Sequence, residues 1–220
     1  MIRLCLTALM AALSVAGAAV ASSNPAMDAA VQRINDRWAH IRYQVTDRDE
    51  QYRELDALAA QAAQVVAHYP GHAEPLLWQG IVTSEEAARA SMLKQLGLAR
   101  SARDILERAW KIDPNAADGG VKMSLGVLYY RVPGWPIGFG STAKARALLE
   151  AALRQDPRGL DNNFFYADFL NDEGHPAEAK TFALRALQAP VNTVRPVWDA
   201  GRRAELRALL AKISAKLHGG

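Results

Sequence analysis

Few residues of this 220-residue chain have the types and spacing that catalysis needs. Cysteine occurs once, as Cys5, inside an apolar run near the N-terminus. There is no Gly-x-Ser-x-Gly motif for a serine nucleophile and no phosphate-binding loop. Gly134, Gly138 and Gly140 are spaced like a glycine-rich nucleotide loop, but they follow a helical pattern and not a strand. Because no set of residues supplies both a nucleophile and a base, the sequence predicts a non-catalytic protein without a cofactor.

Two of the five histidines, His68 and His72, have the i, i+4 spacing of metal ligands on one helix face. Pro70 and Gly71 lie between them and interrupt the helix that would align the two rings. Chance readily supplies such pairs, so the sequence predicts no metal ligand.

Three acidic residues, Asp161, Asp168 and Asp172, fall at positions i, i+7 and i+11 of a helical pattern and therefore share one face. One interpretation is an ordinary solvated face. The other is a charged patch that binds a basic segment or a cation. The spacing alone leaves both open.

The segment 132–140 combines two prolines, three glycines and three large apolar residues, Trp135, Ile137 and Phe139. Proline restricts the backbone and glycine permits tight turns, so this segment is predicted to be a rigid loop between two helices. Its apolar side chains could fold back and plug the end of that helix pair. Alternatively, they could form an aromatic lip on a groove that binds a peptide or a hydrophobic ligand.

The N-terminus has the layout of a secretory signal peptide. A short basic start that includes Arg3 precedes an apolar run over 4–20, and Ala19 and Ala21 form a small-x-small cleavage site. A membrane anchor is the alternative, but about 17 apolar residues are at the lower limit for spanning a bilayer. We therefore expect residues 1–21 to be removed, the mature chain to begin at Ser22 without a transmembrane segment, and the protein to be periplasmic or secreted.

The composition indicates a globular protein held by its core alone. Half of the residues are hydrophobic and the mean hydropathy is −0.11. Cleavage after Ala21 would remove the only cysteine, so no disulfide is expected. It would also remove one of the 26 basic residues, which leaves 25 against 23 acidic ones. With so small an excess and no basic run interleaved with aromatics, a nucleic-acid partner is not expected.

Apolar residues recur at three- and four-residue intervals along most of the chain, and no alternating run of useful length indicates a strand. The sequence therefore predicts an all-α fold of about nine helices. The expected helices cover 25–45, 51–68, 75–97, 99–112, 118–131, 141–156, 160–173, 176–188 and 199–217.

A pattern of small residues repeats three times. Each copy has a glycine, an alanine five positions later, a second alanine after seven more, and a proline at the end. The copies are Gly97, Ala102, Ala109, Pro114; Gly140, Ala145, Ala152, Pro157; and Gly174, Ala179, Ala186, with Pro190 one residue early. Small side chains let two helix backbones approach closely, and the proline ends the second helix. The pattern therefore predicts stacked helical hairpins.

This pattern resembles the tetratricopeptide repeat (TPR) over residues 50–190, where a unit of about 34 residues is typical. Leu125, Gly126 and Tyr129 match the family's Leu-Gly-x-x-Tyr signature in a first helix. The units that end at Pro114 and Pro157 are longer, which we interpret as insertions between their helices. The unit before Pro70 is expected to keep only its second helix. The exported state also makes the chain similar to the helical-repeat T-component of some periplasmic solute transporters.

The resemblance implies a right-handed superhelix of stacked hairpins whose first helices line a concave face that binds protein partners. Residues 22–49 would form an N-terminal helix, 50–190 the repeats, and 191–220 a linker with a C-terminal capping helix. By position, the inner face would carry Leu77, Ile81, Glu85, Met123, Val127, Tyr130, Arg131, Phe164, Asp168, Asn171 and Asp172.

The function implied is that of a non-catalytic periplasmic adaptor that binds a protein or peptide in the cell envelope. The alternative is a carrier of a small hydrophobic ligand or solute. The predicted recognition surface joins the 132–140 loop to the inner face of the neighbouring helices. Its residues are Tyr130, Arg131, Trp135, Phe139, Asp168 and Asp172.

Overall fold

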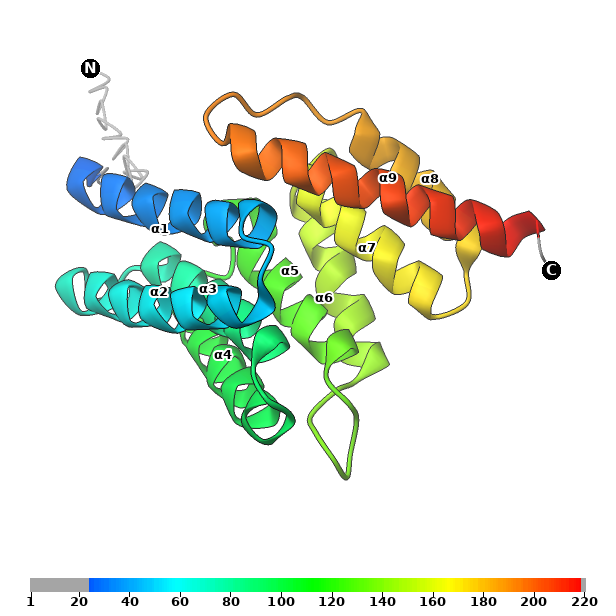
Figure 1. Cartoon of the computed structure of the whole chain (residues 1–220). Coiled ribbons are helices and arrows are strands. Elements are labelled where there is room, and N and C mark those ends of the chain that lie inside the picture. The colour runs from blue at the N-terminus through cyan, green and yellow to red at the C-terminus, as the bar shows by residue number, and fades with distance from the viewer. Residues whose placement is uncertain (1–23, 219–220) are drawn as a thin grey trace, which may run out of the picture.

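The computed structural model describes residues 24–218, and this part of the chain forms nine α-helices and no β-strand (Figure 1). The predicted all-α superhelix of stacked helical hairpins is confirmed. The helices are α1 (Pro25–Gln44), α2 (Arg48–His68), α3 (Ala73–Arg89), α4 (Met92–Ile112), α5 (Ala116–Arg131), α6 (Thr142–Gln155), α7 (Leu160–Asp172), α8 (Pro176–Leu187) and α9 (Pro196–His218). The predicted signal peptide, 1–21, lies outside the described residues. Within 24–218, no helix has the length and apolar character needed to cross a membrane.

Three helix starts follow directly from the sequence, because each is preceded by a residue whose side chain can cap free backbone N–H groups. The Asn24 side chain accepts a hydrogen bond from the backbone N–H of Met27 at 3.1 Å. Asp47 accepts one from Glu50 at 2.7 Å, and Ser141 begins α6 in the same way. These caps fix where α1, α2 and α6 begin.

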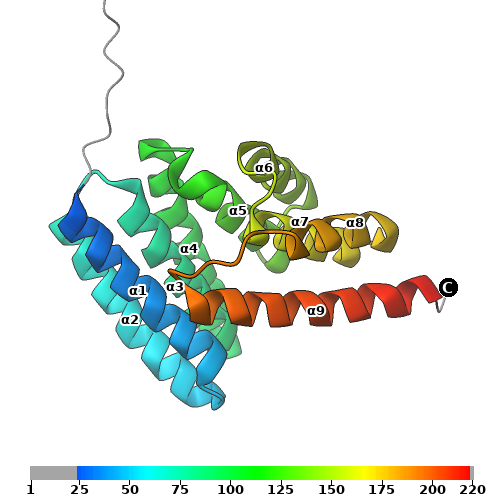
Figure 2. The same cartoon turned by 90° about the horizontal axis from the view of Figure 1, so that it is seen from above.

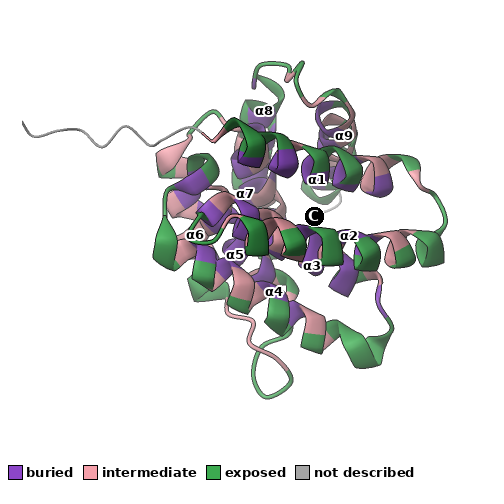
Figure 3. Ribbon diagram, turned by 90° about the vertical axis from the view of Figure 1, so that its left-hand side faces the viewer, coloured by how far each residue is buried: buried purple, intermediate pink, exposed green. Residues whose placement is uncertain are grey.

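Consecutive helices pack as the hairpins α1–α2, α3–α4, α5–α6 and α7–α8. The first helices, α1, α3, α5 and α7, also contact one another in that order, and so they form the inner layer of the stack. In Figure 3 the buried residues lie on the helix faces where neighbouring helices meet. The interpretation that the unit before Pro70 lacks a first helix is wrong, because α1 packs against both α2 and α3.

The repeated alanines lie where the helices of a hairpin touch. Ala102, Ala145 and Ala179, like the second alanine of each copy, have no exposed surface. Facing them, Gly126 of α5 comes so close to α6 that a Cβ atom there would lie 2.8 Å from Cγ of Leu149. Such a distance is shorter than van der Waals contact, so the small residues set the spacing between the helices.

The third predicted helix differs most from the structure. It ends at Arg89, the chain turns at Ala90 and Ser91, and α4 begins at Met92. Gly97 therefore lies inside α4, and a Cβ atom there would have open space around it. Gly140, in contrast, lies two residues before the first residue of α6. The extra residues of this unit lengthen α4 instead of forming an insertion. The apolar spacing continues across the turn, which is why the pattern could not locate it.

The last helix closes the stack. α9 packs against α8, contacts α7, and its N-terminal half meets α1, the first helix of the described chain (Figure 2). It takes the place that the first helix of another hairpin would occupy. The inner face is therefore bordered by α1, α3, α5, α7 and α9, and we call the contact between α1 and α9 the seam.

Candidate binding groove

The inner face encloses a groove of about 1090 Å³, to which all five inner helices contribute. Apolar residues of two inner helices line it, Leu77 and Ile81 of α3 and Met123 and Val127 of α5. Its lining also includes residues of α1 and α9 at the seam. Where the chain leaves α3 and α5, at what we call the rim, it is bordered by residues that include Met92 and Ile137, which are 87% and 67% exposed. The groove therefore opens to solvent at the rim.

Arg42 of α1 lies at the centre of an ion-pair cluster beside the seam. Its guanidinium lies 2.6 Å from a carboxylate oxygen of Glu85 and 2.6 Å from one of Glu205. Arg89 pairs with Glu85 as well, at 2.5 Å. Burial alone would raise the pKa of Glu85, but the charges of Arg42 and Arg89 and a hydrogen bond from Arg89 hold it below its usual value.

Arg202 of α9 completes this cluster. It is only 3% exposed, and it pairs with Asp161 of α7 and with Glu205, each at 2.6 Å. Its guanidinium also lies over the rings of Phe164 and Phe165, 4.6 and 4.5 Å from their centroids. Because these partners belong to α7 and α9, the cluster holds the last helix against the repeats.

Arg195, in the segment before α9, lies beside the cluster but outside it. Its guanidinium lies close to two indole rings, 5.3 Å from the centroid of Trp78 and 4.2 Å from that of Trp198. Its Nε donates a hydrogen bond to Oδ1 of Asn35 at 2.9 Å. The sequence pattern indicates only an irregular linker here, and it does not single out Arg195 or Trp198. The available signal is an arginine and a tryptophan three residues apart.

Three of the predicted site residues are brought together at the contact between α5 and α7. The hydroxyl of Tyr130 donates a hydrogen bond to Oδ2 of Asp168 at 2.6 Å, and Arg131 pairs with the same carboxylate. Burial raises the pKa of Tyr130 well above its usual value, and the charge of Asp168 acts in the same direction. Of these three, Arg131 lines the groove.

The three acidic residues predicted to share a face have different environments. Asp161 pairs with Arg202 and Asp168 with Arg131, whereas Asp172 is exposed at the end of α7. Partial burial, followed by the charge of Asp168, raises the pKa of Asp172. Two of the three are thus joined to arginines of other helices and do not form one acidic patch.

The 132–140 loop divides its apolar residues between the two predicted roles. The ring of Phe139 packs edge-on against Tyr129, with 5.7 Å between centroids, and the guanidinium of Arg103 lies 4.6 Å from the centroid of the Phe139 ring. Phe139 therefore acts as the plug. Trp135 is 90% exposed, and so it does not plug the helix pair. The loop is narrow at its base, where a Cβ atom on Gly140 would clash with the carbonyl oxygen of Val132.

The predicted recognition surface is therefore only partly continuous. Arg131 and Ile137 border the groove, while Trp135 and Phe139 lie on the loop just outside it. Asp168 lies behind Arg131, and Asp172 does not reach the groove. Glu85, Leu77, Ile81, Met123 and Val127 line it, as expected for the inner face.

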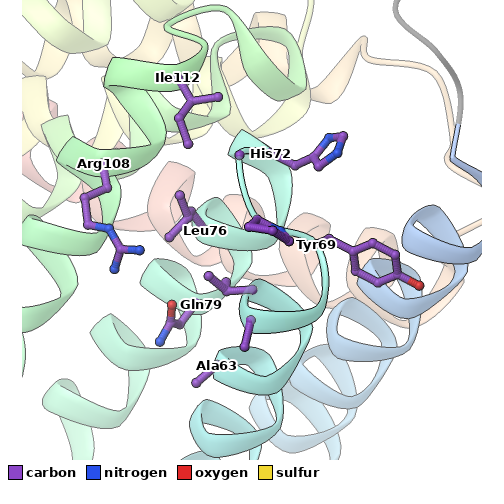
Figure 4. Close-up of a pocket in the computed structure, with 11 residues that line it drawn as sticks. Ala63, Tyr69, His72, Leu76, Gln79, Arg108 and Ile112 are labelled. Carbon is purple, nitrogen blue, oxygen red and sulfur yellow. The ribbon is translucent and has the colours of Figure 1, made fainter.

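A second, smaller hollow of about 430 Å³ lies between the end of α2, α3 and α4 (Figure 4). His72 comes from the turn that precedes α3, and Arg108 of α4 lies across the hollow from it. His68 belongs to the last turn of α2 and its ring packs edge-on against Tyr69. The two histidines thus lie on different elements. Residues 24–218 contain no group of three potential metal ligands close enough to hold an ion.

Sixteen solved chains are similar to this one, among them the following two. The first is TTC0263, a thermophilic TPR protein from Thermus thermophilus, with a TM-score of 0.57 and 16% identity over 84% of this chain and 91% of that one. The second is MamA AMB-1, with a TM-score of 0.44 and 18% identity over 85% of this chain and 99% of that one. No protein-family model and no curated protein matches the sequence. The first likeness shows that the fold is that of a TPR superhelix, and neither supports a similarity to transporter components.

Proposed function

We propose that this chain is a non-catalytic adaptor of the cell envelope that binds an extended segment of a partner protein in its groove. The observation that carries the proposal is the groove of about 1090 Å³, which is lined by apolar residues of α3 and α5 and by charged residues of all five inner helices or the segments beside them. This volume is at the upper limit of the roughly 300–1000 Å³ of a site for a drug-sized ligand, and the groove is open to solvent at the rim. Side chains of a peptide can bury against the apolar residues while its polar groups meet the charged residues.

The alternative of a small-ligand carrier has less support. Such a carrier would need an enclosed apolar pocket, and the residue expected to line it is Trp135. Trp135 is 90% exposed and lines neither of the two hollows described above. An exposed indole on a rigid loop beside an open groove suits an anchor for a polypeptide, because tryptophan is enriched among residues that dominate binding energy.

Binding in the groove is tested by placing a charge on its apolar border. Ile137→Asp changes a side chain that is 67% exposed and borders the groove, so the fold should be retained. We expect a synthetic library of unstructured peptides to bind this variant at least about tenfold more weakly than the unchanged protein. Leu184→Asp is the matched control, since Leu184 is 45% exposed on α8 and does not line the groove. Equal losses in the two variants would contradict the proposal.

Export is a separate part of the proposal. It is supported by the basic start, apolar run and small-x-small site over residues 1–21. Intact-mass measurement of the exported protein should give a chain that begins at Ser22. A mass that includes residues 1–21 would contradict cleavage at this site.

A further inference from the structure

The rim carries the most exposed large apolar side chains of the described residues. Within 24–218 the three highest exposed fractions are those of Leu93 at 97%, Trp135 at 90% and Met92 at 87%, and Ile137 of the same rim is 67% exposed. We call these four residues the apolar tip. Single apolar groups on a surface are common, but a group of four marks a surface that an apolar partner or medium covers.

The apolar tip comes from two segments that meet at one end of the molecule. Two of its members begin α4, and the other two belong to the 132–140 loop. A Cβ atom on Gly138 would lie 3.4 Å from Cδ1 of Leu96, so the loop lies against the first turns of α4. In both Figure 1 and Figure 3 the loop and the start of α4 lie at the lower end of the molecule, and the loop projects past the helices. The apolar tip is therefore convex.

The charged residues of the surrounding segments have one sign. The segments 87–103 and 119–149 contain eight Lys or Arg and no Asp or Glu. The whole chain, in contrast, has 26 basic and 23 acidic residues. The rim is thus a basic region of a nearly neutral protein, and it suits a negatively charged surface.

Carboxylates outside these two segments pair with four of the eight cations. The pairs are Arg89 with Glu85, Arg103 with Asp104, Arg131 with Asp168, and Arg146 with Glu150. Lys122 belongs to the first half of α5, away from the loop. The other three, Lys94, Arg100 and Lys144, form no ion pair within 24–218, and residues 1–23 contain no Asp or Glu. We call these three the free cations.

The free cations lie on both segments that form the apolar tip. Lys94 directly follows Leu93, and its ammonium donates a hydrogen bond to the hydroxyl of Tyr52 at 3.2 Å. That bond raises the pKa of Lys94, with smaller contributions that include the charges of Asp56 and Glu86, but neither carboxylate is close enough to form an ion pair with it. Arg100 is exposed on α4. At the base of the loop, the ammonium of Lys144 lies 5.1 Å from the centroid of the Tyr129 ring.

We propose that the apolar tip and the free cations form a membrane contact, through which the protein binds the surface of a bilayer that contains anionic lipids. The indole of Trp135 suits the level of the headgroups, Leu93 and Met92 suit the acyl region below them, and the cations face the lipid phosphates. A fluid bilayer accepts a convex tip without a matching pocket. A second copy of this chain is a poorer partner, because a symmetric contact would bring the cations of both copies together.

This inference goes beyond the proposed function and does not depend on it, since Leu93 and Trp135 do not line the groove. The test is flotation of the purified exported chain with lipid vesicles. Vesicles of phosphatidylcholine alone are compared with vesicles of phosphatidylcholine and phosphatidylglycerol in equal parts. We expect binding to the mixed vesicles to be at least about tenfold tighter and to weaken as salt is added, because each free cation contributes about fivefold near an anionic surface.

Leu93→Asp tests the apolar tip. The side chain is almost fully exposed and lies outside the groove, so the fold and peptide binding should be retained while binding to mixed vesicles falls by about tenfold or more. Val194→Asp is the matched control. Val194 is 73% exposed in the segment between α8 and α9, which lies at the upper end of Figure 1, away from the rim. All variants share one N-terminus, so any contribution of residues 4–20 to binding is the same in each.

A double variant, Lys94→Gln with Arg100→Gln, tests the free cations. It should lower the preference for mixed vesicles by about tenfold or more and leave binding to phosphatidylcholine unchanged. Lys180→Gln with Arg207→Gln is the matched control, since it removes the same charge from exposed positions of α8 and α9. The control should keep the preference.

Trp135 provides a spectroscopic signature of the contact. It is exposed, whereas the other four tryptophans of the chain are buried or half-buried. Transfer of an indole from water into a bilayer shifts its fluorescence emission to shorter wavelength. Mixed vesicles should therefore shift the emission of the unchanged protein. In Trp135→Phe the shift should be lost while most of the binding remains, because phenylalanine is also apolar.

Each outcome bears on the proposal. Failure to bind either kind of vesicle overturns the membrane contact and leaves peptide binding in the groove intact. Equal binding to both kinds, or a preference that survives the double variant, overturns the role of the free cations. Equal losses in Leu93→Asp and Val194→Asp, or a shift of emission that persists in Trp135→Phe, overturn the assignment to the apolar tip. Dimers that Leu93→Asp dissociates, without vesicle binding, would assign the tip to a second copy of the chain instead.

Discussion

The seam and the rim of the groove differ in the side chains that form them. At the seam, arginines and carboxylates from α1, α3, α7 and α9 hold one another at 2.5–2.6 Å, and aromatic rings cover their faces. At the rim, large apolar side chains project into solvent: Met92, Leu93 and Trp135 are each at least 87% exposed. Charged groups fixed by several partners give orientation and specificity, whereas exposed apolar groups gain free energy when any apolar partner covers them. Under the proposed function, the rim would contribute contact area and the seam would contribute specificity for charge.

The comparison is broken most severely by removing the most deeply buried arginine of the ion-pair cluster beside the seam, Arg202. Arg202→Met leaves Asp161 without its partner and weakens the link between α7 and α9. We expect a loss of about 3–5 kcal/mol in the free energy of unfolding, since removing one partner of a buried pair leaves an uncompensated charge. Arg207→Met on the exposed face of the same helix should change it by less than about 0.5 kcal/mol. Urea unfolding of both variants makes the measurement, and similar losses would show that the cluster is not stabilising.

The packing of the α5–α6 hairpin can be disturbed without changing a residue of the seam or of the rim. Ala145 has no exposed surface at the contact of α5 and α6, so Ala145→Leu should overpack it and lower the free energy of unfolding by about 1–3 kcal/mol. Ala147 is exposed on the same helix, and Ala147→Leu is expected to have little effect. Thermal unfolding of the pair distinguishes them. Equal melting temperatures would mean that the repeat register is wrong.

The seam should also respond to alkaline pH. Burial raises the pKa of Tyr43, whose hydroxyl donates to Glu205, from its usual 10.0 to about 12. Folding thus favours the neutral form of Tyr43. Its contribution to the free energy of unfolding is fully present below pH 10 and is lost as the pH rises from 10 to 12. In Tyr43→Phe the loss of stability across this window should be smaller by about 1–2 kcal/mol. Urea unfolding at about pH 9.5 and about pH 11.5, on either side of most of this titration, gives the comparison, and an unchanged pH dependence would contradict it. Burial raises the pKa of Tyr130 as well, and so Tyr130 contributes equally to the pH dependence of both proteins.

The smallest effect on stability is expected at the rim. Trp135→Ala removes a side chain that is 90% exposed, so the free energy of unfolding should change by less than about 0.5 kcal/mol. Peptide binding should weaken by about 2 kcal/mol or more if Trp135 is an anchor. Phe139→Ala should show the opposite pattern, because Phe139 packs against Tyr129 and plugs the helix pair. A large stability loss in Trp135→Ala with unchanged binding would contradict the anchor role.

The hairpins could be predicted because their determinants are local and chemically restrictive. Two helices in close contact accept little besides Gly and Ala, so positions such as Ala145 and Ala152 mark the contact in the sequence itself. The contact of Tyr130, Arg131 and Asp168 could be predicted for a related reason, since the repeat places the first helices of neighbouring hairpins, here α5 and α7, side by side.

The seam could not be predicted in this way. It joins residues about 160 positions apart, such as Asn35 and Arg195, and neither helix at the seam carries the repeat pattern that would place it. The turn at Ala90 and Ser91 could not be predicted for a different reason. Apolar spacing there is the same in one continuous helix as in two helices, so only the tertiary packing decides.

The contact between α1 and α9 also bears on how the chain folds. In an open solenoid each repeat touches only its neighbours, so the ends can fray and stability is roughly a sum over repeats. Here the first and last described helices are in contact, so opening either end breaks interactions of the other. The domain should therefore unfold in one cooperative transition, and form slowly for a helical protein because its final contacts have a large sequence separation.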